Sequence, residues 1–306
     1  MKVLVATEKP FAKAAVDGIR KILEKENYEM ALLEKESDPQ KLYDAVTDAD
    51  ALIVRSDKVT KEVIAHAKQL KIVVRAGAGF DNLDLEACSA RGIVAMNTPG
   101  QNSNAVAELS LGMMVYMARN QFTPGTGTEL KGKTLGIQAY GNVGRLVANL
   151  AKSFGMNVLA FDPFVSAEKM KEEGVTPVGD LNELYKSSNY VSLHIPANEQ
   201  TKKSINYKLL SQMPQGACLV NTARKEVIDE EDLAKILEER SDFKYITDIA
   251  PDSVAVLKEK FGNRIFATAK KMGAQTAEAN LNAGLAAANQ IVDFLKNGNE
   301  RFRVNK

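Results

Sequence analysis

The sequence predicts an α/β protein built from two doubly wound parallel sheets, and three observations indicate this. Short apolar segments of strand length alternate with helical patterns through the first 98 residues. A second series of the same kind begins at Thr134 with the pattern of a nucleotide-binding βαβ unit. A Pro/Gly break at Asn97–Asn102 separates the two series, and a long apolar helical pattern follows it.

The first lobe is expected to contain five strands with helices between them. Helical spacing of apolar residues predicts helices at Phe11–Lys25 and Thr60–Gln69. Alternation of this kind implies a parallel sheet with helices on both faces, a flavodoxin-like arrangement. The lobe has no glycine-rich phosphate turn, so no second cofactor site is expected there. The predicted strands are Val3–Ala6, Met30–Leu33, Ala51–Val54, Ile72–Arg75 and Ile93–Met96.

The second lobe opens with strand, turn, helix and strand in close succession. Leu135–Ala139 reads as a buried strand, and Asn142–Phe154 repeats apolar residues at helical spacing. Val158–Phe161 is a second buried strand, and Asp162 follows it. The dinucleotide pattern G-x-G-x-x-G is present with alanine in the first place, as Ala139-x-Gly141-x-x-Gly144.

Each part of this turn has a physical task in binding a dinucleotide. Gly141 lets the backbone approach a pyrophosphate, whose charge the N–H groups around Asn142 and Val143 can bind at the start of the helix. Gly144 allows the helix to pack tightly on the strand. Ala139 is expected at an ordinary, negative φ. Asp162 would accept hydrogen bonds from the ribose and repel a 2′-phosphate, which predicts NAD(H) rather than NADP(H).

Several polar residues follow buried strands of the second lobe. Strands are predicted at Tyr190–Ile195, Ala217–Asn221 and Lys244–Thr247. Because ligands of open parallel sheets bind at the carboxyl ends of the strands, the polar residues there are expected to line one site. These residues are Asp162, His194, Arg224 and Asp248.

Two helical patterns are expected to connect the lobes. Asn104–Arg119 leads into the second lobe and is followed by a polar loop, Gln121–Lys133. Gln275–Lys296 returns toward the first lobe and leaves Arg301–Asn305 as a tail. The predicted domains are therefore a substrate-binding domain, residues 1–98 with 280–306, and a Rossmann domain, residues 99–279. A cleft between them would close to exclude water before hydride transfer.

The composition excludes several classes of function. The chain has 306 residues, is 45% apolar and 26% charged, and carries a net charge of +1. No global field favours nucleic acid, and no apolar run has the length of a membrane span. Cys88 and Cys218 lie far apart without metal-ligand or redox spacing, so no metal is expected. They are interpreted as reduced core thiols of a cytoplasmic protein.

Across essentially its whole length, the sequence resembles the D-2-hydroxyacid dehydrogenase family. Several independent motifs carry the resemblance and occur in the family's order. They are VRSDKVT (Val54–Thr60), VVRAGAGFDNLDLEA (Val73–Ala87), NTPGQNSNAVAEL (Asn97–Leu109), YGNVGR with FDPF, SLHIPANEQT (Ser192–Thr201), VNTARKEVIDEEDL (Val220–Leu233), TDIAP (Thr247–Pro251) and KMGAQTAEAN (Lys271–Asn280).

The resemblance implies roles for individual residues. Arg224 would grip the substrate carboxylate and polarise the C2 oxygen, a task that suits a planar fork of donors. Asp248 would orient the nicotinamide carboxamide. The implied substrate-binding residues are Arg55, Ser56, Arg75, Ala76, Gly77 and Asn102, with Lys58 as a further candidate. The implied cofactor-binding residues are Tyr140, Gly141, Asn142, Val143, Gly144, Asp162, His194, Pro196, Thr201, Thr222, Ala223, Asp248 and Gly273.

The sequence departs from the family at the acid–base pair. The family's histidine stands just before an Ile/Leu-Gly-Ala stretch, and here Lys271 precedes Met272-Gly273-Ala274. Ser253, beside Asp252, takes the place of the glutamate partner. The chain has only two histidines, neither at the catalytic position: His66 lies in a surface helical pattern and His194 at a strand end, two residues before Pro196. We interpret His194 as structural or cofactor-side, with a catalytic role as the alternative.

The loss of both partners is chemically consistent. Lysine starts from a pKa of about 10.4, and a neighbouring carboxylate would raise that pKa further. A lysine base instead needs desolvation and a like charge nearby, for which Arg224 is the candidate. We therefore hypothesise that Lys271 replaces the histidine, with Lys270 as the alternative, and expect oxidation to be favoured at alkaline pH.

The activity that the resemblance implies is NAD-dependent oxidation of 3-phospho-D-glycerate, the entry step to serine, by a homodimer joined across the cofactor lobes. Because the chain ends after the crossing helix, no appended regulatory domain and no serine feedback through one are expected. Two alternatives remain. One is reduction of unphosphorylated 2-ketoacids such as hydroxypyruvate or glyoxylate. The other is an NAD(H)-responsive scaffold in which catalysis has lapsed.

Overall fold

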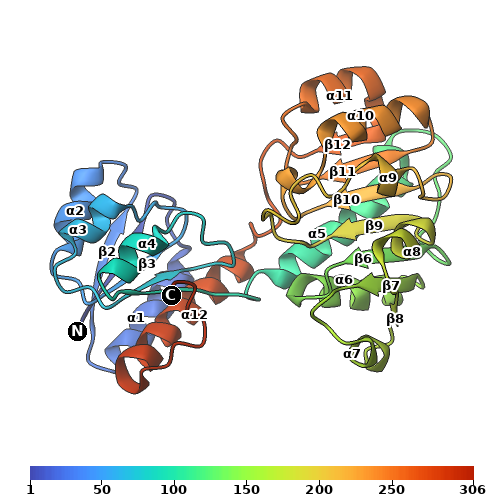
Figure 1. The fold of residues 1–306 in the computed structure, drawn as a ribbon. Helices are drawn as coiled ribbons and strands as arrows, with labels where there is room; N and C mark the ends of the chain where they lie inside the picture. The colour runs from blue at the N-terminus through green and yellow to red at the C-terminus, as the bar shows by residue number, and fades with distance from the viewer. The chain divides into compact units, whose positions relative to one another are not determined.

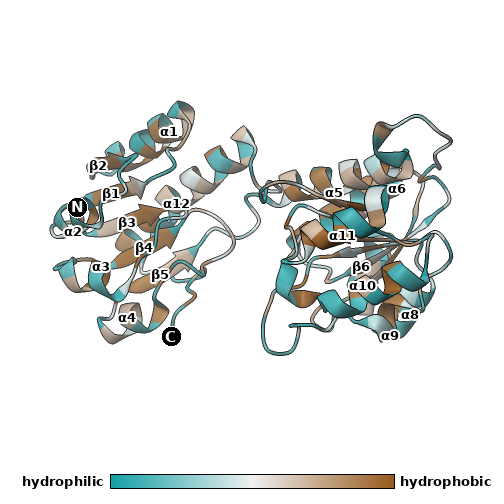
Figure 2. Ribbon diagram, turned by 90° about the horizontal axis from the view of Figure 1, so that it is seen from above, coloured by the Kyte–Doolittle hydropathy of each residue, from teal (hydrophilic) through white to brown (hydrophobic).

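The computed structural model describes all 306 residues and divides into two compact units (Figure 1). Unit 1 comprises residues 1–102 and 275–306, and unit 2 comprises residues 103–274. Each unit contains one parallel sheet between helices, so the predicted α/β class with two parallel sheets is confirmed. Figure 2 shows brown, apolar strands inside unit 1 and many teal, polar residues on the outer helices.

The sheet of unit 1 has five parallel strands in the order β2-β1-β3-β4-β5. Strand β1 lies second, and the chain then continues on its other side, which is the flavodoxin-like order expected from the sequence. Arg75 at the end of β4 stands in register with Val54 at the end of β3. The strands are β1 (Lys2–Thr7), β2 (Glu29–Glu34), β3 (Ala51–Val54), β4 (Ile72–Arg75) and β5 (Val94–Asn97).

Helices cover both faces of this sheet. Alternate residues of the strands point to opposite faces, so one core packs against α1 (Lys13–Glu24) and α12 (Ala277–Asn297). These two helices lie side by side, blue and red in Figure 1. The other core packs against α2 (Pro39–Val46), α3 (Lys61–His66) and α4 (Leu85–Ala90).

The C-terminal tail lies along the open edge of β5. Asn305 Oδ1 accepts the Ala95 N–H at 2.8 Å, and its Nδ2 donates to Ile93 O at 2.9 Å. Arg303 forms an antiparallel bridge with Met96. The segment predicted as a plain tail therefore protects an edge strand from pairing with other chains.

The sheet of unit 2 has seven parallel strands in the order β12-β11-β10-β9-β6-β7-β8. The chain runs outward from β6 to β8 and then returns to β9 on the other side of β6, the topology of a Rossmann sheet. The direction reverses between β6 and β9, where such sheets bind ligands. The strands are β6 (Thr134–Gln138), β7 (Asn157–Phe161), β8 (Thr176–Pro177), β9 (Tyr190–Leu193), β10 (Cys218–Asn221), β11 (Lys244–Thr247) and β12 (Ile265–Ala267).

The helices of unit 2 again form two layers. The core on one face includes residues of α5 (Ser103–Ala118), α6 (Asn142–Ser153) and α7 (Ala167–Glu172). The core on the other face includes residues of four helices: α8 (Leu181–Lys186), α9 (Tyr207–Leu210), α10 (Glu230–Glu239) and α11 (Val254–Phe261). Three short 3₁₀ helices complete the unit: η1 (Asn120–Phe122), η2 (Lys225–Val227) and η3 (Gly262–Arg264).

Both cysteines are free and buried. Burial raises the pKa of the Cys88 thiol to about 11 and that of the Cys218 thiol to about 12, so neither forms a thiolate at neutral pH. The interpretation as reduced core thiols agrees with this placement. No helix in the structure combines the length and the apolar character needed to cross a membrane.

Candidate active site

The glycine turn after β6 has an open anion-binding geometry. Helix α6 starts at Asn142, directly after Gly141, and a Cβ on Gly141 would have no atom within 4 Å. The space beside Gly141 is therefore open at the positive end of the α6 dipole, and no side chain caps the helix there. A Cβ on Gly144 would instead overlap the carbonyl oxygen of Ala139, so the tight helix–strand packing expected there is present.

The expectation for Ala139 was wrong. Its φ is +78°, in the left-handed region that favours glycine. The turn keeps the backbone path that the first glycine of the pattern normally provides, although the residue carries a Cβ. Because Gly144 packs against the Ala139 carbonyl, the helix holds this residue in its strained conformation.

Replacing Ala139 by glycine is expected to stabilise the protein. Glycine adopts this φ without steric cost, so the substitution removes strain from the folded state. This relief exceeds the free-energy cost of the more flexible unfolded chain by about 0.5–1 kcal/mol. Thermal unfolding without cofactor should show a midpoint roughly 1–4 °C higher. Ala197→Gly, in an exposed loop at negative φ, is the control and should not raise the midpoint. An unchanged or lower midpoint for Ala139→Gly would contradict the assignment of strain.

Two backbone N–H groups orient the carboxylate of Asp162, which follows β7. Its Oδ2 accepts the Tyr140 N–H at 2.7 Å and its Oδ1 accepts the Phe164 N–H at 2.8 Å. The Tyr140 side chain is buried, and burial raises its pKa above the usual value. Tyr140 therefore contributes to this edge through its backbone, by orienting the carboxylate.

His194, after β9, is partly buried and hydrogen-bonded to a neighbouring side chain. Its Nε2 lies 3.0 Å from Ser192 Oγ, and its backbone N–H donates to Gln138 O at 3.0 Å. Burial lowers the pKa of His194 to about 3. A ring that is neutral throughout the working pH range and bonded to a serine favours a structural role over a catalytic one.

This histidine should make the protein sensitive to acid. Its ordinary pKa near 6.5 applies in the unfolded chain, so between about pH 6.5 and 3 the unfolded state binds a proton that the folded state does not. Unfolding free energy should therefore fall by up to about 1.4 kcal/mol per pH unit below pH 6.5. In His194→Asn this part of the slope should disappear, as measured by urea unfolding at pH 7, 6 and 5. The exposed His66→Asn should keep it; equal slopes in all three proteins would contradict the prediction.

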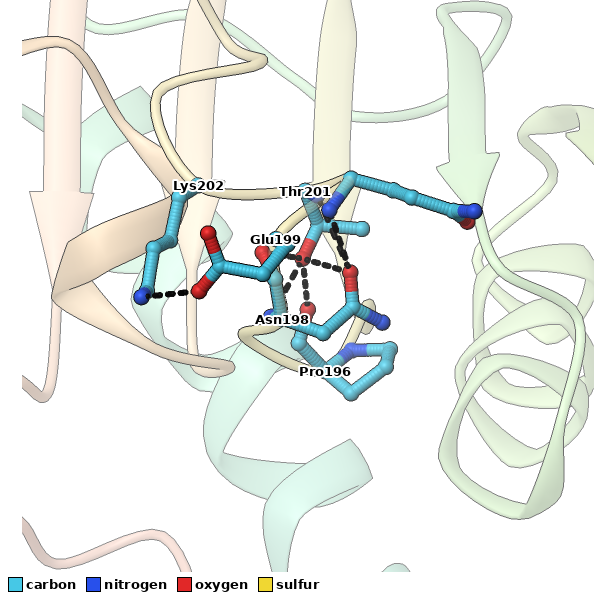
Figure 3. Close-up of polar contacts among 6 residues, drawn as sticks. Pro196, Asn198, Glu199, Thr201 and Lys202 are labelled. Carbon is cyan, nitrogen blue, oxygen red and sulfur yellow. Dashed lines mark hydrogen bonds and ion pairs between the residues drawn. The ribbon is translucent and has the colours of Figure 1, made fainter.

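The loop after His194 is shaped by its own side chains (Figure 3). Thr201 Oγ1 donates to Pro196 O at 2.6 Å and accepts the Asn198 N–H at 2.8 Å. Asn198 Oδ1 accepts the backbone N–H groups of Gln200 and Thr201. Glu199 pairs with Lys202 at 2.5 Å. Thr201, predicted at the cofactor, thus fixes the conformation of the loop that carries Pro196.

The turn after β10 presents Arg224. Buried Asn221 clamps it, because Asn221 Oδ1 accepts the Ala223 N–H and Nδ2 donates to Arg224 O, both at 2.9 Å. Thr222 is buried, with its Oγ1 3.2 Å from Ser110 Oγ of α5. Arg224 is partly buried, and its Nη1 donates to Ala223 O at 2.9 Å.

Lys271 reaches the same carbonyl oxygen. Its Nζ donates to Ala223 O at 3.3 Å, so the ammonium and the Arg224 guanidinium converge on one acceptor. This arrangement supplies the like charge expected beside a lysine base. The desolvation expected there is not observed, because Lys271 is exposed.

The residues in place of the family's glutamate are engaged elsewhere. Asp252 pairs with Lys225 at 2.5 Å. Ser253 donates both its Oγ–H and its N–H to Glu230 Oε2, at 2.5 and 2.9 Å. Asp252 and Ser253 therefore serve the packing of this loop against η2 and α10.

The predicted substrate residues of unit 1 lie on neighbouring strand ends. Arg75 Nε donates to Arg55 O at 3.0 Å, and the Arg75 guanidinium lies where a Cβ on Gly77 would be. Arg55 Nη1 donates to Lys9 O and Pro10 O at 3.1 Å each, and Nη2 donates to Asn280 Oδ1. Ala76 is buried, Ser56 and Lys58 are exposed, and Asn102 is partly buried at the end of the first segment of unit 1.

Unit 2 therefore brings the predicted cofactor and catalytic residues to one edge of its sheet, at the ends of β6, β7, β9, β10 and β11. Sequence reasoning missed three contributors: Asn221, which shapes the Arg224 turn, Ser192, which holds His194, and the bond between Asp248 and the Lys271 segment. Asn221 ends a predicted strand before Thr-Ala-Arg, a local signal of a polar turn clamp. The other two contacts have no local signal.

The geometry fits a dinucleotide. Gly141 leaves room beside the start of α6 for a pyrophosphate. The carboxylate of Asp162 is oriented for a ribose, and Asp248 carries a buried oxygen, Oδ1, without a hydrogen-bond partner. These features lie in the order in which a dinucleotide crosses the switch point of a Rossmann sheet.

The fold and this edge define an NAD-binding dehydrogenase domain, and sequence comparison agrees. Residues 92–275 match the model of the D-isomer specific 2-hydroxyacid dehydrogenase NAD-binding domain. The chain therefore belongs to the D-isomer specific 2-hydroxyacid dehydrogenases.

Three relatives indicate where the chain stands in that family. An NAD⁺-bound 3-phosphoglycerate dehydrogenase of Entamoeba histolytica is 49% identical, with a TM-score of 0.90 over 100% of this chain and 99% of that one. A D-3-phosphoglycerate dehydrogenase of Methanocaldococcus jannaschii is 36% identical over 84% of this chain and 52% of its own length. A hydroxypyruvate reductase of Thermotoga maritima is 34% identical over 88% and 92%. The chain spans about half the length of the first two curated relatives it matches.

Proposed function

We propose that the protein oxidises 3-phospho-D-glycerate to 3-phosphohydroxypyruvate with NAD as hydride acceptor, the first step of phosphorylated serine synthesis. The observation that carries the proposal is the convergence of Arg224 and Lys271 on Ala223 O, at the sheet edge that fits NAD. The 49% identity to a phosphoglycerate dehydrogenase over the full chain supports the choice of substrate.

The proposed roles follow from the donors present. Arg224 binds the substrate carboxylate through its guanidinium fork and places a second donor near the C2 oxygen. Neutral Lys271 accepts the C2 hydroxyl proton as the C2–O bond becomes a carbonyl, and ammonium Lys271 returns that proton in reduction. Bound NAD supplies the acceptor for the hydride that leaves C2. Arg224 and Lys271 donate to the same carbonyl oxygen, so the two side chains lie close together at the proposed reaction centre.

NADH consumption with 3-phosphohydroxypyruvate, hydroxypyruvate and pyruvate tests the proposal. A large preference in kcat/KM for the phosphorylated substrate is expected. Activity on unphosphorylated acids alone would replace the proposal with the reductase alternative. NADH binding without turnover of any ketoacid would indicate a lapsed enzyme that acts as a scaffold.

The proposed phosphate site is the Arg55 and Arg75 pair. The hydrogen bonds of Arg55 go to neutral oxygens only. Burial lowers the pKa of its guanidinium, and the charge of nearby Asp57 opposes this effect in part. A phosphate dianion would add charge-assisted bonds worth about 1.5–3 kcal/mol.

Arg55→Gln should therefore lower kcat/KM for 3-phosphohydroxypyruvate by about 10–100-fold and leave that for hydroxypyruvate within about threefold. Lys61→Gln, an equal charge change at an exposed position of unit 1, is the control. Because Arg55 also ties Lys9 and Pro10 to α12, thermal unfolding must show that the variant is folded. An equal loss for both substrates would contradict a phosphate role.

One observation favours the reductase alternative. Arg55 already donates to two main-chain carbonyls and to Asn280, contacts that serve the packing of unit 1 and need no phosphate. The relative from Thermotoga maritima, which matches this chain over 92% of its own length, is a hydroxypyruvate reductase. The substrate comparison and Arg55→Gln together separate the two functions.

We further infer a homodimer in the cytoplasm. The end of α5 and residues 128–131 line a surface hollow with Phe154, which is 47% exposed, and Phe122 nearby in the sequence is 69% exposed. Exposed aromatic side chains such as Phe122 and Phe154 suit contact with a second copy of the chain. Sedimentation equilibrium measures the oligomeric state.

The two free cysteines support the inference of a reducing compartment such as the cytoplasm.

A further inference from the structure

The two oxygens of the Asp248 carboxylate lie in different surroundings. The residue follows β11 and has no solvent exposure. Its Oδ2 accepts the Gly273 N–H at 2.6 Å and the Met272 N–H at 3.2 Å. Its Oδ1 is buried without a hydrogen-bond partner. Because an unsatisfied buried acceptor is costly, the Oδ1 atom indicates a donor that arrives with a ligand.

The segment between β12 and Gly273 is fitted closely to Asp248. At its start, Thr268 Oγ1 donates to Asp248 O at 3.0 Å. At its end, a Cβ on Gly273 would lie 2.9 Å from Asp248 Oδ2 and 3.3 Å from Val106 Cγ2 of α5. Asp248 therefore holds both ends of the segment, and Lys271 lies inside it.

We propose that Asp248 is the positioning residue for Lys271, and that the same carboxylate joins the placement of this lysine to the binding of the nicotinamide amide. Oδ2 fixes the Lys271 turn through two backbone N–H groups, and Oδ1 would accept an amide N–H of bound NAD, the role that the family resemblance implies for Asp248. The inference rests on the proposed function, in which Lys271 Nζ moves the proton.

The physical reason lies in the length of the lysine side chain. Four rotatable carbon–carbon bonds separate Nζ from the backbone, so Nζ is placed only if the backbone at 271 and the acceptor at Ala223 O are both fixed. A displacement of about 1 Å at a reacting group costs on the order of 10²-fold in rate. The buried Asp248 carboxylate fixes the backbone of this turn and so meets the first of these two requirements.

Two variants separate the two oxygens. In Gly273→Ala the new Cβ pushes the turn away from Oδ2 and leaves the carboxylate in place. We expect kcat at saturating NADH to fall at least about tenfold, a larger factor than any rise in the Kd for NADH. In Asp248→Asn the side-chain oxygen can still accept the N–H groups of the Lys271 turn. The side-chain NH₂ group then faces the amide N–H of the cofactor, which needs an acceptor. We expect the Kd for NADH to rise at least about tenfold, with a smaller change in kcat at saturating NADH.

A measurement independent of turnover tests the same point. Each protein is treated with an amine-specific acylating reagent, and the labelling rates of Lys271 and its neighbour Lys270 are compared by peptide mass spectrometry. Gly273→Ala should change the Lys271 rate at least about threefold relative to Lys270. Asp248→Asn should change it less, and Gly112→Ala, a helix position with open space, should not change it.

The outcomes are distinct. The proposal is overturned if Gly273→Ala keeps the wild-type kcat and Lys271 labelling, or if both variants lose kcat and NADH affinity in equal proportion. If the wild-type protein turns over no hydroxyacid, the proposed function fails, and labelling and NADH binding still decide whether Asp248 positions Lys271.

Discussion

Lys271→Ala is expected to lower kcat in both directions by about 10²–10⁴-fold, the usual contribution of a general acid–base group. The variant loses the amine that exchanges a proton with the C2 oxygen, while Asp162 and the glycine turn remain. The Kd for NADH, measured by its fluorescence, should therefore stay within about threefold of the wild-type value. Near-full turnover with intact NADH binding would contradict the assignment of Lys271.

Lys270→Ala is the matched control, since it removes the same group one residue earlier. It should keep wild-type kcat; loss in this variant alone would move the role to Lys270. The pH dependence adds a second criterion. Oxidation needs neutral lysine and should rise toward alkaline pH, whereas reduction needs the ammonium and should fall there. The rise should be absent from the residual activity of Lys271→Ala.

Arg224→Lys is expected to lower kcat/KM by about 10²-fold or more. Lysine keeps the charge but lacks the planar fork that binds a carboxylate through two donors. The loss should appear in both KM and kcat, because the same guanidinium is proposed to hold the carboxylate and to polarise the C2 oxygen. Steady-state kinetics with each ketoacid measure it, and Lys186→Gln, exposed on α8, is the control.

Arg224→Gln tests the proximity of the two cations. Removing the charge that shares Ala223 O with Lys271 makes the protonated lysine more stable. The alkaline rise of oxidation should therefore move to higher pH than in the wild type. An unmoved profile would show that Arg224 does not act on Lys271, whatever the loss in rate.

Much of the fold could be predicted, because its signals are local. Ala51–Val54, Ile72–Arg75 and Lys244–Thr247 are strands with the bounds predicted, since continuous apolar runs are typical of buried parallel strands. Strands β8 and β12 were missed, because two or three residues at a sheet edge leave no measurable pattern. Tyr190–Ile195 ends two residues early, at Leu193, where His194 turns into the loop.

The sequence by itself determined the two parallel sheets, the dinucleotide turn, the acidic residue after β7 and the presence of Lys271 at the position where the family has its histidine. These features depend on residue type and short spacing, which a chain displays without being folded. Only the tertiary structure decided that Ala139 has a positive φ, that Arg224 and Lys271 share one carbonyl oxygen, and that Asp248 holds the Lys271 turn. Each of these depends on segments 5 to 48 residues apart, which meet only when the sheet orders its strands and the helices pack upon it.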